Sequence, residues 1–352
     1  MVADAQRSSV FVRPPPRLSE SLRKKGKMRE TKSLRLQIET EWSTIAQSCD
    51  GAAGITFVND KDDEEVPSSI WGGNFVYLED NYRPSPHLKL NTRSDTATPL
   101  VPDDIIPYMA FCRCSTDCVF EDNNCCQDKE GLKRQGLKGF AYTNVCITIF
   151  SPFNFTYGLH HVVVECGPFC LCPVTCGNRV AQRPRQFPIE IFKTPLCGWG
   201  VRTPVDIVKG MVLGVYTGCF LVCALKRKSS RGKPKKYCFD LDYNDHDERK
   251  NLYTVDSRRY GNWTRFINHS CAPNLRVQPV VYDTLPQQNI AFLAFIATDD
   301  IPARKELTFD YDPEAQREYL AALYEKRTPP PMQKGATVCG CDAEHCRGWV
   351  RT

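Results

Sequence analysis

The sequence lacks an apolar segment long enough to cross a lipid bilayer. Its longest uninterrupted apolar run, residues 290–297, is far shorter than the roughly 20 residues that a membrane-spanning helix needs. Residues 1–4 also lack the apolar core of a secretory signal. These absences argue against a membrane or secreted protein, and they predict reduced thiols, as in the cytosol or nucleus. No internal repeat is present either, which argues against a repeat fold.

Histidine is scarce, with six residues, whereas cysteine is abundant, with nineteen. An odd number of cysteines fits metal binding better than a complete disulfide framework. Cysteines one residue apart are also hard to join by a disulfide, whose geometry needs a narrow range of Cα distances, but both can bind zinc. Twelve of them fall into three clusters. The first contains Cys112, Cys114, Cys118, Cys125 and Cys126, the second Cys166, Cys170, Cys172 and Cys176, and the third Cys339, Cys341 and Cys346.

The first two clusters allow two ligand schemes. Their nine thiolates supply the twelve ligands of three zinc ions if three sulfurs bridge two metals each. Alternatively, they form two separate four-cysteine sites with one spare thiol. In both schemes the zinc ions are structural, because such loop-rich regions have thin apolar cores and need cross-links.

The third cluster has three ligands and needs a fourth from elsewhere in the chain. The best candidate is Cys271, which directly follows the polar stretch Asn268-His269-Ser270. A zinc ion bound in this way would fasten the C-terminal tail to the domain that contains Cys271.

The net charge is +5, and much of the excess lies in residues 23–29 and 226–236. These basic segments are either solvated surface charge or sites that attract nucleic acid, chromatin or the nuclear import machinery.

Residues 1 to about 30 have the composition of a disordered tail. Leu34, Ile38, Trp42 and Ile45 then recur at helical spacing, which predicts an amphipathic helix that packs on the body of the protein. From residue 189 onward, short β-rich runs alternate with turns and predict a compact, curved β domain. These runs are 189–192, 211–216, 237–241, 290–295 and 307–311. The apolar segment 145–164 is either a set of strands or an insertion foreign to the fold.

Three motifs occur in order in the second half of the chain: Gly198-Trp199-Gly200, residues 265–271 (RFINHSC) and residues 306–311 (ELTFDY). Together they resemble the SET domain of protein lysine methyltransferases. The nine cysteines before them resemble a pre-SET module, and residues 339–349 resemble a post-SET module. The combination is similar to the suppressor-of-variegation class, fungal members above all, which methylates lysine 9 of histone H3 in heterochromatin.

The resemblance implies a mostly β fold, the SET-domain β-clip of short curved sheets, with pre-SET and post-SET regions stapled by zinc. It divides the chain into a basic tail plus helix (1–49), a pre-SET zinc-cluster region (50–187), a SET catalytic domain (188–312), a linker (313–338) and a post-SET zinc module (339–352). It favours three zinc ions in the pre-SET cluster and one in the post-SET site.

The resemblance also implies S-adenosylmethionine as methyl donor and a set of site residues. Tyr311 would be the catalytic tyrosine, Tyr216 a second tyrosine of the lysine channel, and Phe309 the residue that permits di- and trimethylation. The donor would be bound by Gly198, Trp199, Gly200, Tyr237, Arg265, Asn268, His269 and Trp349.

Two departures from the family pattern bear on activity. Cys219 stands where the family usually has glutamate, and Cys125 and Cys126 are adjacent where the family has one residue between them. A catalytically inactive scaffold with the SET fold is therefore the main alternative to an enzyme, and a zinc-binding interaction module is a third. The resemblance implies the histone H3 N-terminal tail as substrate, heterochromatin recruitment proteins as partners, and a nuclear, chromosomal location without membrane association.

Overall fold

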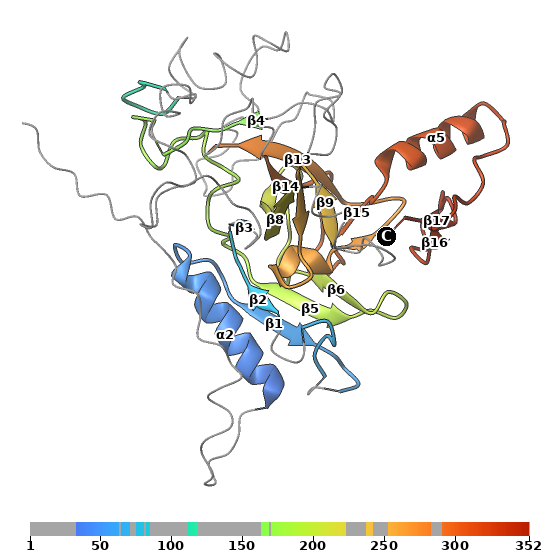
Figure 1. Cartoon of the computed structure of the whole chain (residues 1–352), viewed down its shortest axis with the longest axis horizontal. Coiled ribbons are helices and arrows are strands. Elements are labelled where there is room, and N and C mark those ends of the chain that lie inside the picture. The colour runs from blue at the N-terminus through green and yellow to red at the C-terminus, as the bar shows by residue number, and fades with distance from the viewer. Residues whose placement is uncertain are drawn as a thin grey trace, which may run out of the picture.

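A computed structural model describes residues 33–62, 65–70, 75–80, 82–84, 112–118, 163–168, 170–222, 237–241, 253–282 and 291–351. Short strands packed in small sheets form its centre, and helices lie at two opposite sides (Figure 1). No helix among these residues has the length and apolar character to cross a membrane. The mostly β fold expected from the sequence is confirmed.

One small sheet joins distant parts of the chain. Its strands are β1 (Ile55–Val58), β5 (Ile189–Lys193) and β6 (Trp199–Arg202), in that order. β1 and β5 run parallel, with Ile55 opposite Ile189. Side chains alternate between the two faces of a strand, so Ile55 and Phe57 enter the core together with Ile189 and Ile191. Trp199, at the start of β6, packs against this core and makes an edge contact with Phe57.

The largest sheet brings two of the three sequence motifs together. It is built from β12 (Asn268–His269), β15 (Thr308–Phe309), β13 (Leu275–Val281), β14 (Phe292–Ala297) and β7 (Val212–Val215), with β4 (Val163–Val164) on β13. Every side chain of β14 is buried, as expected for a strand covered on both faces. β12 and β15 are parallel and place His269 opposite Phe309.

The remaining strands frame this centre. A third sheet has the order β3 (Tyr82–Pro84), β8 (Gly218–Val222), β10 (Tyr253–Asp256) and β9 (Cys238–Asp240). β11 (Tyr260–Gly261) pairs with β2 (Val76–Tyr77), and the 3-10 helix η3 (Trp263–Phe266) follows β11. Near the C-terminus, β16 (Thr337–Val338) pairs with β17 (Trp349–Val350).

The predicted amphipathic helix is confirmed as α2 (Leu34–Ser48), which begins after its N-cap residue Ser33. Trp42 is buried and stacks on Tyr77 at a centroid distance of 4.7 Å. The side chains of Ser43 and Glu39 accept hydrogen bonds from the backbone N–H groups of Ile55 and Phe57. The helix thus covers the free edge of β1, where unpaired backbone groups would otherwise be exposed.

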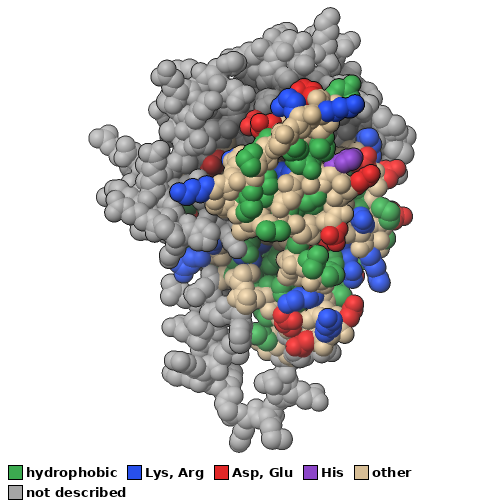
Figure 2. All heavy atoms as spheres, turned by 90° about the vertical axis from the view of Figure 1, so that its right-hand side faces the viewer, with side chains coloured by type: hydrophobic (Ala, Val, Ile, Leu, Met, Phe, Trp, Pro, Cys, Tyr) green, Lys and Arg blue, Asp and Glu red, His purple; other side chains and the backbone are tan. Residues whose placement is uncertain are grey.

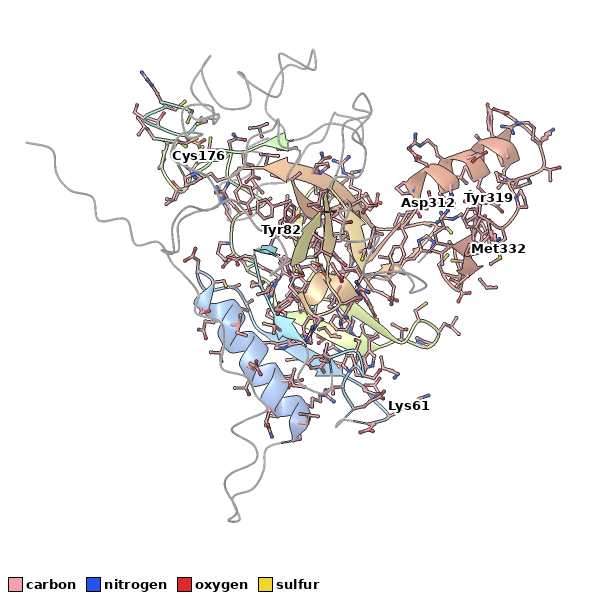
Figure 3. The ribbon with its side chains drawn as sticks, in the orientation of Figure 1. Lys61, Tyr82, Cys176, Asp312, Tyr319 and Met332 are labelled. Atoms are coloured by element: carbon pink, nitrogen blue, oxygen red, sulfur yellow. The ribbon has the colours of Figure 1, made fainter. Side chains whose placement is uncertain are left out.

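A second helix, α5 (Pro313–Tyr324), lies in the segment that the sequence had suggested only as a linker. Asp312 caps it by accepting a hydrogen bond from the N–H of Ala315, and Pro313 occupies the first helical turn, where a missing N–H costs nothing. Figure 3 places Asp312 and α5 on the opposite side of the β centre from Cys176.

Four of the predicted strands lie where expected, as β5, β7, β9 and β15, although β15 is shorter than its predicted run. The run at 290–295 corresponds to β14, which begins at Phe292. Of the segment 145–164, Val163 and Val164 form β4, and the rest lies outside the described residues together with the basic segments 23–29 and 226–236.

Candidate functional site

A cavity of about 950 Å³ lies where the three sequence motifs meet. Its volume is at the upper end of the range typical for small-molecule sites. The lining comes from residues 67–69, 197–199, 216, 237–240, 264–269, 309, 311–314, 338–341, 350 and 351. The face formed by the C-terminal elements carries acidic and basic side chains interspersed with apolar ones (Figure 2).

Tyr311 follows β15 and lines the cavity, with 38% of its surface exposed. Its hydroxyl donates to the carbonyl oxygen of Ile267 at 2.9 Å, and its backbone N–H donates to Nδ1 of His269 at 3.2 Å. Although part of the residue is exposed, desolvation of the hydroxyl, which donates to Ile267, raises the pKa of Tyr311 above its ordinary value. The hydroxyl therefore stays neutral, and because its proton is engaged by Ile267, its oxygen lone pairs remain available.

Tyr216 and Phe309 lie beside Tyr311 in the same cavity. The hydroxyl of Tyr216 donates to the carbonyl oxygen of Tyr237 at 3.0 Å, and burial raises the pKa of Tyr216 above its ordinary range. Phe309 is 4.7 Å from Tyr311 between ring centroids, and it stacks on Phe239 at 5.8 Å. Together these rings give the cavity an aromatic wall.

The Gly-Trp-Gly motif approaches the cavity at the start of β6. Gly198 has φ +75°, a left-handed conformation that glycine adopts without strain. A Cβ atom on Gly200 would lie only 2.5 Å from Oε1 of Glu306. The side-chain amide of Asn268 donates to Glu306 at 2.8 Å and to the carbonyl oxygen of Trp199 at 3.3 Å. The motif is thus held against β12 by one amide.

His269 connects the cavity to a cysteine. Its Nδ1 accepts from the N–H of Tyr311, so a neutral ring must carry its proton on Nε2. That nitrogen lies 3.3 Å from Sγ of Cys271. Burial lowers the pKa of His269 to about 4, even though the nearby Asp310 carboxylate opposes the shift. The neutral ring is thus a direct neighbour of the Cys271 thiol, and a ring nitrogen also belongs to the compact group of potential metal ligands around it.

Arg265 and Tyr237 form one corner of the cavity. The guanidinium of Arg265 lies 4.4 Å above the ring of Tyr237, and its Nε donates to the carbonyl oxygen of Ser257 at 3.0 Å. Its Nη1 also donates to Oγ of Ser69 at 3.1 Å. Burial lowers the pKa of Arg265, yet its ordinary value is so high that the group stays charged.

Trp349 occupies a less direct position than the other predicted donor-binding residues. It is 4% exposed within β17, and its neighbours Val350 and Arg351 line the cavity instead. Gly200 likewise lies behind the lining, in β6. The remaining predicted catalytic and donor-binding residues all line the cavity.

Cys219, the first departure from the family pattern, lies in β8 opposite Asp256 of β10. It is outside the cavity lining.

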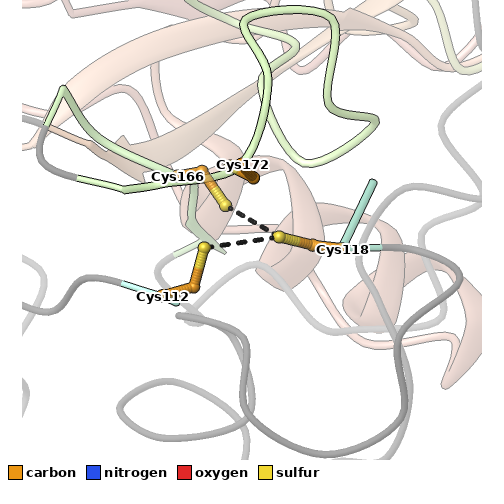
Figure 4. Close-up of side chains that lie close together, drawn as sticks. All are labelled: Cys112, Cys118, Cys166 and Cys172. Carbon is orange, nitrogen blue, oxygen red and sulfur yellow. Dashed lines mark hydrogen bonds between the residues drawn. The ribbon is translucent and has the colours of Figure 1, made fainter. Parts of the chain in front are cut away.

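The first two cysteine clusters come together at one place, next to β4 (Figure 4). Sγ of Cys118 lies 3.5 Å from that of Cys112 and 3.6 Å from that of Cys166, and Cys172 completes a compact group of four. A tetrahedral zinc ion with Zn–S bonds of about 2.3 Å holds its sulfurs about 3.8 Å apart. The spacing therefore fits zinc, and Nη2 of Arg179 donates to Cys172, which helps to balance the thiolate charge.

Three further cysteines belong to the same buried cluster: Cys114, Cys170 and Cys176. Backbone N–H groups of Cys112 and Cys118 donate to the sulfurs of Cys170 and Cys176. Cys125 and Cys126 lie outside the described residues.

The third cluster does recruit Cys271. Sγ of Cys346 lies 3.6 Å from that of Cys341 and 3.9 Å from that of Cys271. Cys339, Cys341 and Cys271 also form a compact group of potential metal ligands with a ring nitrogen of His269. These separations also fit a tetrahedral zinc site. Since Cys271 follows β12 and the others lie in the tail, a metal here would fasten the tail beside the cavity.

Several residues of the cavity lining were not predicted from the sequence, among them the turn 67–69, Cys197, residues 312–314 and the C-terminal Val350 and Arg351. Cys197 directly precedes Gly198 and could have been found from that position. The turn 67–69 lies far from every motif in the sequence, and only the contact between Ser69 and Arg265 reveals it.

Comparison with known families and proteins agrees with this arrangement. A SET domain model matches residues 198–312, and a Pre-SET motif model matches residues 47–179. The protein from cattle called "Histone-lysine N-methyltransferase SUV39H2" is 32% identical over 95% of this chain and 70% of its own length. The mouse protein of that name is 31% identical over 95% of this chain and 61% of its own.

Solved structures show the same likeness. A complex of KRYPTONITE with DNA, a histone H3 peptide and S-adenosylhomocysteine superposes with TM-score 0.57 and 26% identity, over 84% of this chain and 51% of that one. The Neurospora SET-domain protein DIM-5, a histone lysine methyltransferase, superposes with a TM-score of 0.54 and 28% sequence identity. The match covers 73% of this chain and 94% of that one. The chain spans between 30% and 70% of the lengths of the first curated relatives it matches.

Proposed function

This chain belongs to the Pre-SET and SET-domain family of histone-lysine methyltransferases, and from that premise we propose that it transfers methyl groups from S-adenosylmethionine to lysine 9 of histone H3. The observation that carries the proposal is the single cavity that joins the Gly-Trp-Gly turn, the Asn268-His269 strand and Tyr311. A fission-yeast relative is named for specificity toward lysine 9 of histone H3. It is 37% identical over 54% of this chain and 38% of its own length.

The donor-binding part of the cavity consists of the residues that surround β12 and the Gly-Trp-Gly turn. Gly198, Trp199, Asn268 and His269 would hold the methionine and adenine parts, and Arg265 and Tyr237 would close one corner. Trp349 and Gly200 would support this wall from behind. The donor, when bound, supplies a methyl group on a sulfonium. Two acidic residues also line the cavity and suit a cationic ligand: Glu314, and Asp312, whose carboxylate caps α5 and pairs with Arg351.

The acceptor lysine must present a neutral amine with its lone pair aligned to the methyl group. The aromatic wall of Phe309, Tyr216 and Tyr311 favours the neutral amine by desolvation. The Tyr311 oxygen, whose proton is engaged by Ile267, would accept a hydrogen bond from the amine and so fix the direction of its lone pair. Alignment of this kind supplies much of the acceleration in a displacement reaction.

Phe309 would set the number of methyl groups added. Its ring carries no hydroxyl and is 7% exposed between Phe295 and Tyr311. The space that a tyrosine hydroxyl would take stays free, so that a methylated amine can turn and react again. We expect di- and trimethylated products.

The zinc sites would be structural. The pre-SET cysteines, including Cys125 and Cys126, would hold three ions, and Cys271, Cys339, Cys341 and Cys346 would hold one. The corresponding division is a pre-SET region at 50–187, a SET domain at 188–312 and a post-SET module at 339–352. Closed thiolate sites without an open ligand position stabilise folds and do not catalyse.

The histone tail would bind as an added strand. β9 ends its sheet among the described strands, and Phe239 of β9 lines the cavity. Backbone pairing along such an edge gives affinity, while side-chain pockets give specificity. Heterochromatin proteins would recruit the chain in the nucleus, and the basic segments would contact nucleic acid.

Two measurements test the proposal. Calorimetry should detect binding of S-adenosylmethionine, and mass spectrometry over a panel of histone-tail peptides should find methylation of the H3 tail at lysine 9. The matched control is the same peptide with lysine 9 replaced by arginine. Donor binding without modification of any peptide would instead identify an inactive scaffold, and absence of donor binding would contradict both.

A further inference from the structure

A buried ion pair connects the third cysteine cluster to the strand end that carries Tyr311. Nη2 and Nη1 of Arg347 donate to Oδ1 and Oδ2 of Asp310 at 2.9 and 3.0 Å. The Arg347 side chain is 0% exposed and that of Asp310 is 8% exposed. Arg347 directly follows Cys346, and Asp310 directly precedes Tyr311. One interaction therefore joins the neighbours of a cysteine-site residue and of the cavity tyrosine.

The remaining donors of Arg347 fix the surrounding elements. Its Nε donates to the carbonyl oxygen of Trp349 at 3.0 Å, and its Nη1 also donates to Oε1 of Gln316 in α5 at 3.2 Å. Gln316 in turn donates to the carbonyl oxygen of His345 at 3.0 Å. A planar guanidinium can satisfy these partners together, whereas the ammonium group of lysine cannot pair with a carboxylate through two parallel bonds.

The Asp310 side chain constrains the backbone next to Tyr311. Its Oδ1 accepts from the backbone N–H of Asp312 at 2.9 Å as well as from Arg347. Tyr311 lies between these two aspartates, and its own N–H donates to His269. Arg347 of the C-terminal tail thus holds the Asp310 carboxylate in place, and this carboxylate in turn holds the backbone next to Tyr311.

We propose that Arg347 and Asp310 are positioning residues, which couple ordering of the Cys271, Cys339, Cys341 and Cys346 site to the placement of Tyr311. The inference rests on the proposed function and deepens it. The alternative is that the pair only stabilises the fold. Breaking a buried ion pair is strongly destabilising in general, so a loss of activity could reflect a loss of folded protein. The two explanations differ in what happens to molecules that remain folded.

The test compares Arg347→Met, Arg347→Lys and the near-isosteric Asp310→Asn with a control, Arg327→Met. Arg327 pairs with Glu325 at the end of α5, and both side chains are more than half exposed. For folded protein, the proposal predicts that kcat falls about 100-fold in Arg347→Met, the size of loss that an error of about 1 Å in placement can cause. Zinc content should be unchanged, and KM for the peptide should change much less than kcat.

Two further results are expected. Arg347→Lys should recover part of kcat, and the double variant Arg347→Met/Asp310→Asn should be no worse than the single ones, because both remove the same interaction. Hydrogen exchange in residues 307–312 should quicken when zinc is chelated from the wild type. In Arg347→Met it should be fast with zinc bound, and in Arg327→Met it should match the wild type.

The proposal is overturned if kcat per folded molecule stays at the wild-type value in both Arg347→Met and Asp310→Asn. It is also overturned if kcat falls only in proportion to lost zinc or lost folded protein. If Arg347 variants fail to fold, Asp310→Asn and Gln316→Met decide by the same criteria. Hydrogen exchange does not depend on methyl transfer. A wild-type protein without activity would therefore contradict the proposed function, while hydrogen exchange would still test the coupling.

Discussion

Replacing Tyr311 by phenylalanine separates catalysis from stability. The substitution removes one hydroxyl and leaves the ring contacts with Phe309 and His269, at centroid distances of 4.7 and 5.3 Å. In the folded state it deletes the 2.9 Å hydrogen bond to Ile267 and leaves that buried carbonyl without this donor. A loss of this kind costs about 1–3 kcal/mol of unfolding free energy.

The expected effect on the reaction is larger. If the Tyr311 oxygen orients the amine and stabilises charge in the transition state, its removal should slow methyl transfer by about 10²–10³-fold, or about 2.7–4 kcal/mol. Single-turnover methylation of an H3 peptide at saturating donor measures the chemical step, and thermal unfolding of the same sample measures stability. Calorimetry should show donor affinity close to that of the wild type.

The control is Tyr324→Phe, because Tyr324 is 89% exposed at the end of α5 and lies outside the cavity lining. It should leave both rate and stability unchanged. The reasoning is refuted if Tyr311→Phe transfers methyl at the wild-type rate. It is also refuted if the rate falls no further than the folded fraction does.

Three other predictions address the channel, the metal site and the N-terminal helix. Phe309→Tyr should shift products toward monomethyl-lysine, because the added hydroxyl fills space between the aromatic rings; an unchanged product distribution by mass spectrometry would remove the argument from channel size. Cys271→Ser should lower bound zinc by one ion per chain by metal analysis and loosen the tail, whereas Cys49→Ser, a cysteine outside the clusters, should retain full zinc; equal zinc in both variants would contradict the borrowed ligand. Trp42→Ala should lower the unfolding free energy by about 3–5 kcal/mol in denaturant titrations, as for other buried aromatic residues, and a loss below about 1 kcal/mol, the scale of ordinary surface substitutions, would show that α2 is not part of the cooperative core.

Local patterns predicted the elements whose signals lie within a few residues. The helical spacing of Leu34, Ile38 and Trp42 was enough to predict α2, because a helix presents side chains three and four positions apart on one face. Ile38 and Trp42 are buried as expected, whereas Leu34, at the first position of the helix, is 38% exposed. The short β-rich run at residues 189–192 was enough to predict β5. The recruitment of Cys271 followed from two local signals: three thiolates leave a tetrahedral zinc ion incomplete, and Cys271 directly follows the polar stretch Asn268-His269-Ser270.

Long-range placements could not be predicted in this way. The register that puts Ile55 opposite Ile189 depends on core packing across more than a hundred residues. The helix α5 was overlooked because prolines nearby suggested a linker, although Asp312-Pro313-Glu314 is a good helix start. The pairing of Arg347 with Asp310 has no sequence signature, because neither residue type is unusual at a surface.

The most direct test is to follow the methyl group itself. The chain is incubated with S-adenosylmethionine labelled in its methyl group and with intact histone H3, and the labelled residue is mapped by mass spectrometry. The account predicts label on lysine 9, with more than one methyl per lysine at long times, and none when Tyr311→Phe replaces the wild type. Donor bound in the cavity with no label on any histone lysine would contradict it.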